Sequence, residues 1–177
     1  MNYLHIDKSS IGNGPGVRVV LWVAGCTLHC EGCQNSESWD FNAGKLFDEN
    51  AKQELFKAMN KPYIRGITIS GGHPLEYKNL PDIYDLIKEI KTQFPDKDIW
   101  LYTGYMLSIN DFDTTVDICW DNGLLKNYII AMCDVVVDGP YIKEQRDITL
   151  RFCGSKNQRL IDVQKTLKQN TIITIQN

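Results

Sequence analysis

The hydrophobic positions of this chain fall into short continuous runs separated by longer amphipathic stretches. The first run, residues 17–23, is β-branched and nearly continuously apolar, which predicts a buried strand. Three further runs have the same character, and glycine-containing turns close most of them. These runs lie at residues 66–70, 98–102 and 134–138.

Helical periodicity fills the intervals between these runs. Asp48 is placed to cap a helix that runs to about Asn60. Apolar residues at positions 83, 86, 87, 90 and 94 predict an amphipathic helix that ends at Pro95. A third helix is expected between about residues 115 and 130, and residues 171–175 form either a late strand or a mobile tail.

Strands that alternate with helices predict an α/β fold with a parallel sheet and crossover helices. We expect one domain over residues 1–177, with residues from about 165 onward as a possible appended tail or strand. Ligands of such sheets bind beyond the carboxyl ends of the strands. The four segments that follow the predicted strands should therefore meet at one edge and form the site.

Composition and charge narrow the function classes. The chain has 177 residues and a net charge of −3, which argues against a nucleic-acid partner because phosphate binding usually needs a basic face. No apolar run approaches the roughly 18 residues of a transmembrane helix, so no membrane association is expected. The N-terminus lacks the basic and apolar regions of a signal peptide, which favours a cytoplasmic protein.

Three of the six cysteines lie within eight residues, as Cys26, Cys30 and Cys33. In a reducing compartment, clustered cysteines usually indicate metal or redox chemistry. Iron–sulfur clusters are usually held by four cysteines, so three ligands would leave one iron open for catalysis. The dispersed cysteines, Cys119, Cys133 and Cys153, are not at ligand spacing and are interpreted as structural.

Three other interpretations of the cysteine motif remain open. In the first interpretation the three cysteines are buried core residues, although the segment around them is polar. The second is a non-catalytic zinc-binding module with His29 or His73 as the fourth ligand. The third is a thioredoxin-like pair, which leaves Cys26 unexplained.

The C-x3-C-x2-C spacing after a first strand resembles the radical S-adenosylmethionine superfamily. Five further stretches make the resemblance more specific, and together they run from residue 2 to about 163. They resemble the activating proteins of anaerobic (class III) ribonucleoside-triphosphate reductases. The stretches are NGPGVR at 13–18, SGGHPL at 70–75, WLYTGY at 100–105, DGP at 138–140 and GSKNQR at 154–159.

This resemblance implies an incomplete (β/α) barrel on a mostly parallel sheet, of the radical S-adenosylmethionine type. It implies that Cys26, Cys30 and Cys33 hold a [4Fe–4S] cluster whose fourth iron binds S-adenosylmethionine. Reductive cleavage of this cofactor would generate a glycyl radical on the large subunit of the reductase, with no catalytic residue beyond the cluster and the cofactor. A flavodoxin-like protein is the implied electron donor.

The resemblance also implies that Gly32, Cys33, Gln34 and Gly72 line the cofactor. Gly71 and Gly72 lack a Cβ and so let backbone approach a ligand closely, although a plain turn would use them too.

His73 departs from the resembled family, which usually has an acidic residue there. A neutral imidazole can accept a hydrogen bond from the methionine ammonium, so we expect cofactor binding to weaken below a pH of about 6.5. The alternative is a solvent-facing histidine.

A second enzymatic interpretation is an activase of another glycyl-radical enzyme, such as pyruvate formate-lyase. Those activases are longer and differ in the stretch at 154–159. Within that stretch, Asn157, Gln158 and Arg159 either contact cofactor or partner or belong to a surface loop.

Overall fold

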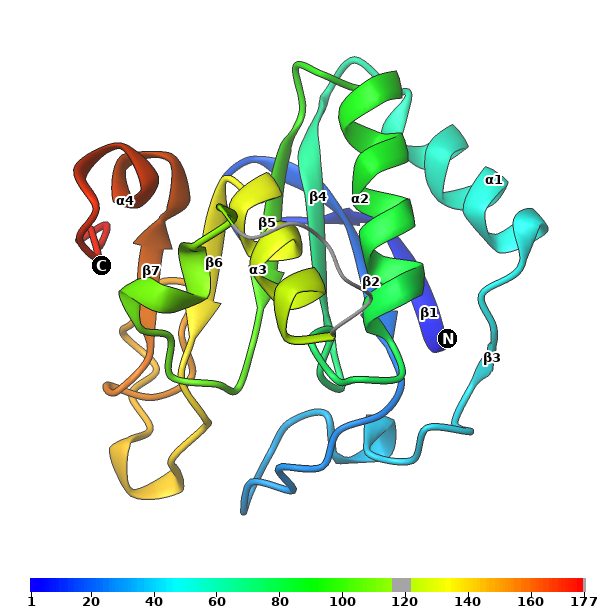
Figure 1. The fold of residues 1–177 in the computed structure, drawn as a ribbon. Helices are drawn as coiled ribbons and strands as arrows, with labels where there is room; N and C mark the ends of the chain where they lie inside the picture. Colours follow the sequence, from blue (N-terminus) through cyan, green and yellow to red (C-terminus); the bar gives the residue numbers. More distant parts are fainter. Residues whose placement is uncertain (116–121, 177) are drawn as a thin grey trace.

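The computed structural model describes residues 1–115 and 122–176. Within them, seven strands form one mixed sheet in the order β3-β1-β2-β4-β5-β6-β7 (Figure 1). The strands are β1 (Asn2–Ser10), β2 (Val17–Val23), β3 (Lys45–Leu46), β4 (Ile64–Gly71), β5 (Asp98–Tyr102), β6 (Val135–Asp138) and β7 (Arg159–Asp162). The α-helices are α1 (Glu49–Met59), α2 (Leu80–Gln93), α3 (Asn122–Met132) and α4 (Val163–Gln169). Short 3-10 helices are η1 (Ser36–Ser38), η2 (Ile109–Phe112) and η3 (Lys143–Gln145).

The four strands predicted from the apolar runs form the centre of the sheet. β2, β4, β5 and β6 pair in parallel, as the alternation with helices predicts. The edges differ, because β1 pairs antiparallel with β2 and β3, and β7 pairs antiparallel with β6. The sheet is therefore mixed, and only its centre is parallel.

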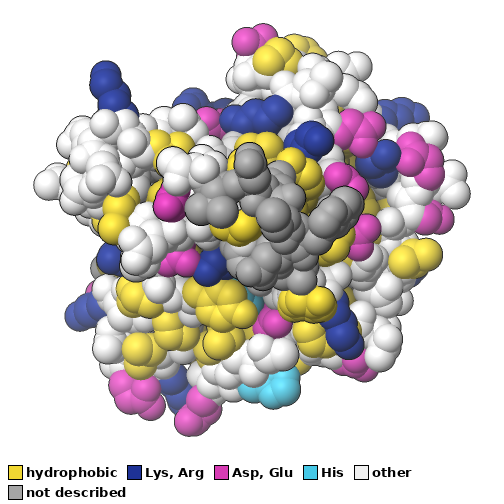
Figure 2. All heavy atoms as spheres, viewed as in Figure 1, with side chains coloured by type: hydrophobic (Ala, Val, Ile, Leu, Met, Phe, Trp, Pro, Cys, Tyr) yellow, Lys and Arg dark blue, Asp and Glu magenta, His cyan; other side chains and the backbone are white. Residues whose placement is uncertain are grey.

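Helices α1, α2 and α3 cover one face of this sheet (Figure 1). The large apolar core lies between them and the sheet, and it includes Leu21, Ile69 and Leu101, which are fully buried. Seen from the same side, charged side chains surround the outer surface of the helices (Figure 2). Hydrophobic side chains gather at the lower left of that view, over the loops that follow β5 and β6.

The predicted extent of α1 and the predicted C-terminal end of α2 are confirmed. The Asp48 side chain accepts a hydrogen bond from the Ala51 backbone at 2.9 Å and so caps α1. α2 ends before Phe94 and Pro95, as the proline predicts.

The third helix is expected from about residue 115, but Thr115 is not helical and bonds to Asp113 instead, and α3 is Asn122–Met132. Residues 116–121, which include Cys119, lie outside the described residues.

The C-terminal segment is joined to the sheet edge. Ile161 and Thr174 form an antiparallel bridge, and the Ile175 backbone donates to the Leu160 carbonyl at 2.7 Å. Residues 171–176 thus lie against β7 through an isolated bridge and form no strand of the sheet, and the interpretation of this segment as an appended tail stays a prediction. Among the described residues, no helix has the length and apolar character that crossing a membrane requires.

Candidate functional site

The cysteine segment follows β2 and folds back over η1 at the carboxyl edge of the sheet. The Gly25 backbone donates to the Ser38 carbonyl at 2.7 Å, and the Cys26 backbone donates to the Trp39 carbonyl at 3.0 Å. Cys26 is buried, whereas Cys30 and Cys33 are half-buried. The segment thus presents two of its three thiols toward the surface.

The loop between β4 and α2 is hydrogen-bonded to the start of the cysteine segment. The Gly72 backbone donates to the Val23 carbonyl at 2.8 Å, and the His73 backbone donates to the Gly25 carbonyl at 2.7 Å. The Asn79 side-chain amide donates to the Ala24 carbonyl at 2.9 Å. These bonds fix the approach of the chain to Cys26.

Gly71 and Gly72 are required by this close contact between two backbones. A Cβ on Gly71, whose φ is +104°, would lie 2.6 Å from the Val23 carbonyl oxygen. A Cβ on Gly72 would lie 2.6 Å from the Gly25 carbonyl oxygen. Glycine is therefore needed at both positions because the backbone after β2 packs directly against them. Contact of these glycines with a cofactor stays a prediction.

Backbone N–H groups contact the sulfurs of Cys26 and Cys33. The Asn35 backbone donates to Cys33 Sγ at 3.4 Å. Burial raises the pKa of the Cys26 thiol above its usual value, although N–H groups of Leu28 and His29 act in the opposite direction. Hydrogen bonds of this kind stabilise thiolate sulfur and tune the potential of an iron–sulfur cluster.

The described residues contain no group of three or more His, Cys, Asp or Glu side chains arranged to hold one metal ion. A cubane cluster places each thiolate on a different iron, so its ligands stand farther apart than thiolates that share a single ion. The role of the three cysteines as cluster ligands therefore stays a prediction.

A cleft of about 310 Å³ opens beside the cysteine segment, on the sheet face opposite the helices. This volume lies at the lower end of the range for small-molecule sites, about 300 to 1,000 Å³. Its walls come from the segments after β2 and β6, from the β1–β2 loop, and from side chains near the carboxyl ends of β2, β4 and β5. Of the described residues in the loops that follow β4 and β5, none lines it. Residues that line it include Asn13, Trp22, Cys33, Ser70, Tyr102 and Tyr141.

The cleft combines aromatic rings with polar groups, which suits a nucleoside ligand. Among the described residues, the buried Nε1 of Trp22 has no hydrogen-bond partner. A buried donor without an acceptor is unfavourable, and an acceptor on a bound ligand would satisfy it. The cleft residues therefore fit a cofactor such as S-adenosylmethionine.

The predicted cofactor residues divide into two groups. Cys33 and Gln34 line the cleft, and Gly32 is exposed beside them with a φ of +72°. His73 lies beneath the cysteine segment and is only 1% exposed, so the interpretation of this side chain as solvent-facing is wrong.

Both ring nitrogens of His73 have partners. Nδ1 lies 3.3 Å from Glu76 Oε1, and Nε2 lies 2.7 Å from Thr103 Oγ1. Burial lowers the pKa of His73, although the neighbouring carboxylate opposes this effect. The ring is therefore neutral at pH 7.

The stretch around 154–159 mostly stabilises its own loop. The Arg159 guanidinium forms an ion pair with Asp138, which is fully buried and also accepts from the Leu107 backbone at 2.8 Å. The Asn157 amide donates to the Pro140 carbonyl at 2.7 Å. Gln158 lines the cleft as well, so of these three it is the one placed to meet a ligand there.

Sequence reasoning missed two side chains that shape the site. Glu76 is buried and hydrogen-bonded to the cysteine segment. It lies just after the stretch at 70–75, and no hydrophobic pattern or motif in the sequence marks it. Arg18 is fully buried within an apolar run. A charged residue inside such a run is a signal that it has a buried partner.

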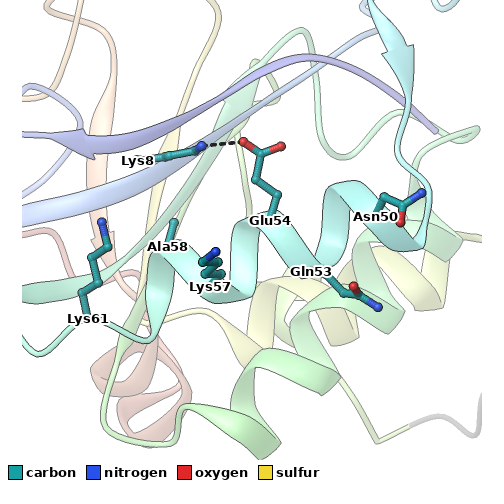
Figure 3. Close-up of a pocket in the computed structure, with 7 residues that line it drawn as sticks. All are labelled: Lys8, Asn50, Gln53, Glu54, Lys57, Ala58 and Lys61. Atoms are coloured by element: carbon teal, nitrogen blue, oxygen red, sulfur yellow. Dashed lines mark ion pairs between the residues drawn. The ribbon is translucent and has the colours of Figure 1, made fainter.

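A second hollow, between β1 and α1, is unrelated to the cysteine segment (Figure 3). Lysines dominate its walls, and Lys8 forms a 2.7 Å ion pair with Glu54 across it. Both side chains are about half exposed, as expected of a solvated surface groove. None of the residues that line it belongs to the segments after the parallel strands.

Comparison with known proteins agrees with this geometry. A family described as a 4Fe-4S single cluster domain matches residues 12–161. The anaerobic ribonucleoside-triphosphate reductase-activating protein of Haemophilus influenzae is 38% identical over 160 residues, which cover 89% of this chain and 96% of that protein. Proteins of the same name from phage T4 and Escherichia coli K12 are 39% and 34% identical, and they cover 90% and 89% of this chain. The matches cover 93% and 96% of those two proteins.

Proposed function

Because this chain belongs to the family of anaerobic ribonucleoside-triphosphate reductase-activating proteins, we propose that it generates a glycyl radical on such a reductase. The observation that carries the proposal is that the three-cysteine segment runs beside a cleft of nucleoside size and contributes Cys33 to its wall. The large subunit of the reductase is the protein substrate.

Cys26, Cys30 and Cys33 would hold a [4Fe–4S] cluster through three of its irons. When bound, the cluster supplies the single electron that breaks a carbon–sulfur bond of S-adenosylmethionine. Cys30 and Cys33 are half-buried, and because Cys33 belongs to the cleft wall a cluster on these thiols would be reachable from the cleft. Cys26 is buried on the other side of the segment, and the Asn35 N–H donates to Cys33 Sγ at the cleft wall.

Gly32, Cys33 and Gln34 line the cofactor in this proposal, and Gly71, Gly72 and His73 lie behind them. Cys33 and Gln34 support it most directly, because they belong to the cleft wall. Tyr102 stands on the opposite wall, and its hydroxyl donates to the Phe152 carbonyl at 2.8 Å. This bond holds the 150–154 loop against the cleft.

We interpret the sheet as an incomplete (β/α) barrel. The helices lie on its outer face, and the cleft lies on the other face, which is the arrangement of a barrel interior. Such a barrel exposes its cofactor to a large protein substrate. The flavodoxin-like electron donor and the cytoplasmic location remain predictions.

The cluster is tested by iron and acid-labile sulfide content after anaerobic reconstitution. We expect about four irons and four sulfides per chain. Cys26→Ala should lose most of both, whereas Cys133→Ala removes a thiol from the helix-covered core and should retain them. Zinc without sulfide in the wild-type protein would overturn the enzymatic function in favour of a zinc-binding module.

The choice of partner is tested by electron spin resonance. The loaded protein is mixed with S-adenosylmethionine, a reductant and either the anaerobic reductase or pyruvate formate-lyase. A glycyl radical on the reductase alone is the expected result. A radical on pyruvate formate-lyase alone would contradict the proposed partner.

A further inference from the structure

Glu76 is a buried carboxylate without a cationic partner among residues 1–115 and 122–176. Its exposed fraction is 6%, and its ionic neighbour is His73, whose ring is neutral at pH 7. Burial would raise the pKa of Glu76, but hydrogen bonds from Thr27 and His73 outweigh this effect and leave the pKa below its usual value. Glu76 therefore carries a full negative charge inside the protein.

This charge is bonded to the cysteine segment. Glu76 Oε1 accepts from the Thr27 backbone at 2.8 Å and from the Thr27 hydroxyl at 2.6 Å. Thr27 directly follows Cys26 in the chain. Two charge-assisted hydrogen bonds thus tie the residue beside the buried thiol to the loop after β4.

His73 holds the carboxylate from the other side. Because a carboxylate can only accept, His73 Nδ1 carries the proton that faces Glu76. Nε2 then accepts from the Thr103 hydroxyl, whose oxygen accepts in turn from the Tyr105 backbone at 3.2 Å. The network joins three strand-end loops, with Glu76 at its centre.

We propose that Glu76 is a positioning residue that also sets the reduction potential of the cluster. It fixes Thr27, and through Thr27 it fixes Cys26 and the N–H groups that face the Cys26 sulfur. A buried anion beside a cluster disfavours the addition of an electron and so lowers the reduction potential. His73 acts by orienting Glu76, because neither ring nitrogen is free to meet the cofactor.

The inference rests on the proposed cluster, and it is tested by redox titration of the reconstituted full chain without S-adenosylmethionine. Glu76→Gln retains an acceptor oxygen for Thr27 and removes the charge. We expect unchanged iron and sulfide content and a positive shift of the midpoint potential. Glu76→Asp keeps the charge, so its potential should stay close to that of the wild type.

Glu31→Gln is the matched control, because Glu31 lies between Cys30 and Cys33 but is exposed and paired with Lys143. Solvent and the lysine screen its charge, so its shift should be clearly smaller than that of Glu76→Gln. An unchanged potential in Glu76→Gln, or an equal shift in Glu76→Asp or Glu31→Gln, would overturn the role of the buried charge. Absence of a cluster from the wild type is a different result, which overturns the proposed function itself.

Discussion

Side chains along β2 and β5 alternate between two faces of the sheet that are stabilised differently. Val19, Leu21 and Leu101 belong to the large apolar core beneath the helices. Arg18 and Trp100 lie on the opposite face, with the Arg18 guanidinium 5.3 Å from the Trp100 ring. The helix-covered face is stabilised by the packing of a large apolar core. The cleft face combines a smaller apolar cluster around Trp100 with a few directed hydrogen bonds from Arg18.

Arg18 makes several of the directed hydrogen bonds on the cleft face. Its Nε donates to Thr68 Oγ1 at 2.8 Å, and its Nη2 donates to the Ile67 carbonyl at 2.7 Å. Nη1 forms a 2.5 Å ion pair with Asp98. The Thr68 hydroxyl in turn donates to the Asn13 carbonyl at 2.7 Å, which ties the β1–β2 loop to the cleft.

The largest expected effect is that of Arg18→Met. Loss of the guanidinium removes the donors to Asp98 Oδ1, Thr68 Oγ1 and the Ile67 carbonyl. Arg65 still pairs with Asp98 Oδ2, and the free energy of unfolding should fall by about 3 to 5 kcal/mol. Because Asn13 lines the cleft, affinity for S-adenosylmethionine should fall as well. Urea unfolding and equilibrium binding, both under anaerobic conditions, measure the two effects. A loss of stability below about 1 kcal/mol would show that packing also dominates this face.

Leu101→Ala tests the helix-covered face of the same sheet. The cavity left by this fully buried side chain should lower the free energy of unfolding by about 3 kcal/mol. The affinity of the folded protein for S-adenosylmethionine should remain that of the wild type, because no cleft contact is removed. If binding of S-adenosylmethionine weakened as much as in Arg18→Met, the helix-covered face would contribute to cofactor binding as much as the cleft face does.

The smallest expected effect is the pH dependence that arises from His73. Its pKa is lowered in the folded protein, so below about pH 6.5 the unfolded chain binds a proton that the folded chain does not. The free energy of unfolding should therefore fall as the pH drops below 6.5, with a slope of at most about 1.4 kcal/mol per pH unit. Glu76 and Tyr105 face this ring, and Lys126 of α3 disfavours its protonation.

His73→Gln should flatten this part of the profile, as unfolding measured from about pH 7.5 to 5.5 would reveal. Parallel profiles for the wild type and the variant would contradict the assignment. The predicted weakening of cofactor binding with falling pH assumes a hydrogen bond from the cofactor to His73, and both ring nitrogens are instead bonded to neighbouring loops.

The central strands were predictable because continuous apolar runs have one stable environment, a sheet covered on both faces. β1 was not predicted, because its outer half is exposed and polar and its pairing with β2 depends on tertiary contact. β7 spans only Arg159–Asp162, too short for a periodic signal. Edge strands take their structure from the neighbour they pair with.

Spacing and resemblance single out the cysteine segment, and its role in holding a cluster stays a prediction. The meeting of the loops after β2, β4 and β5 followed from topology. The role of Glu76 was not predictable, because it depends on the distance between its carboxylate and a segment 49 residues away in sequence. His73 was expected to face a ligand, yet both of its nitrogens are taken by neighbouring loops. Residue spacing can indicate a set of metal ligands that lie close together in the sequence, but it does not predict hydrogen bonds between loops that are distant in the sequence.

The hydrogen bonds between the start of the cysteine segment and the loop after β4 have a consequence for the order of folding. β1 and β2 form a local hairpin, but β2 pairs with β4 only after the chain has passed through the cysteine segment and α1. Long-range parallel pairing is slow, because loop-closure entropy is lost before the contacts form. The thiols therefore reach their final arrangement late, and iron and sulfide are best supplied to a chain that has already folded.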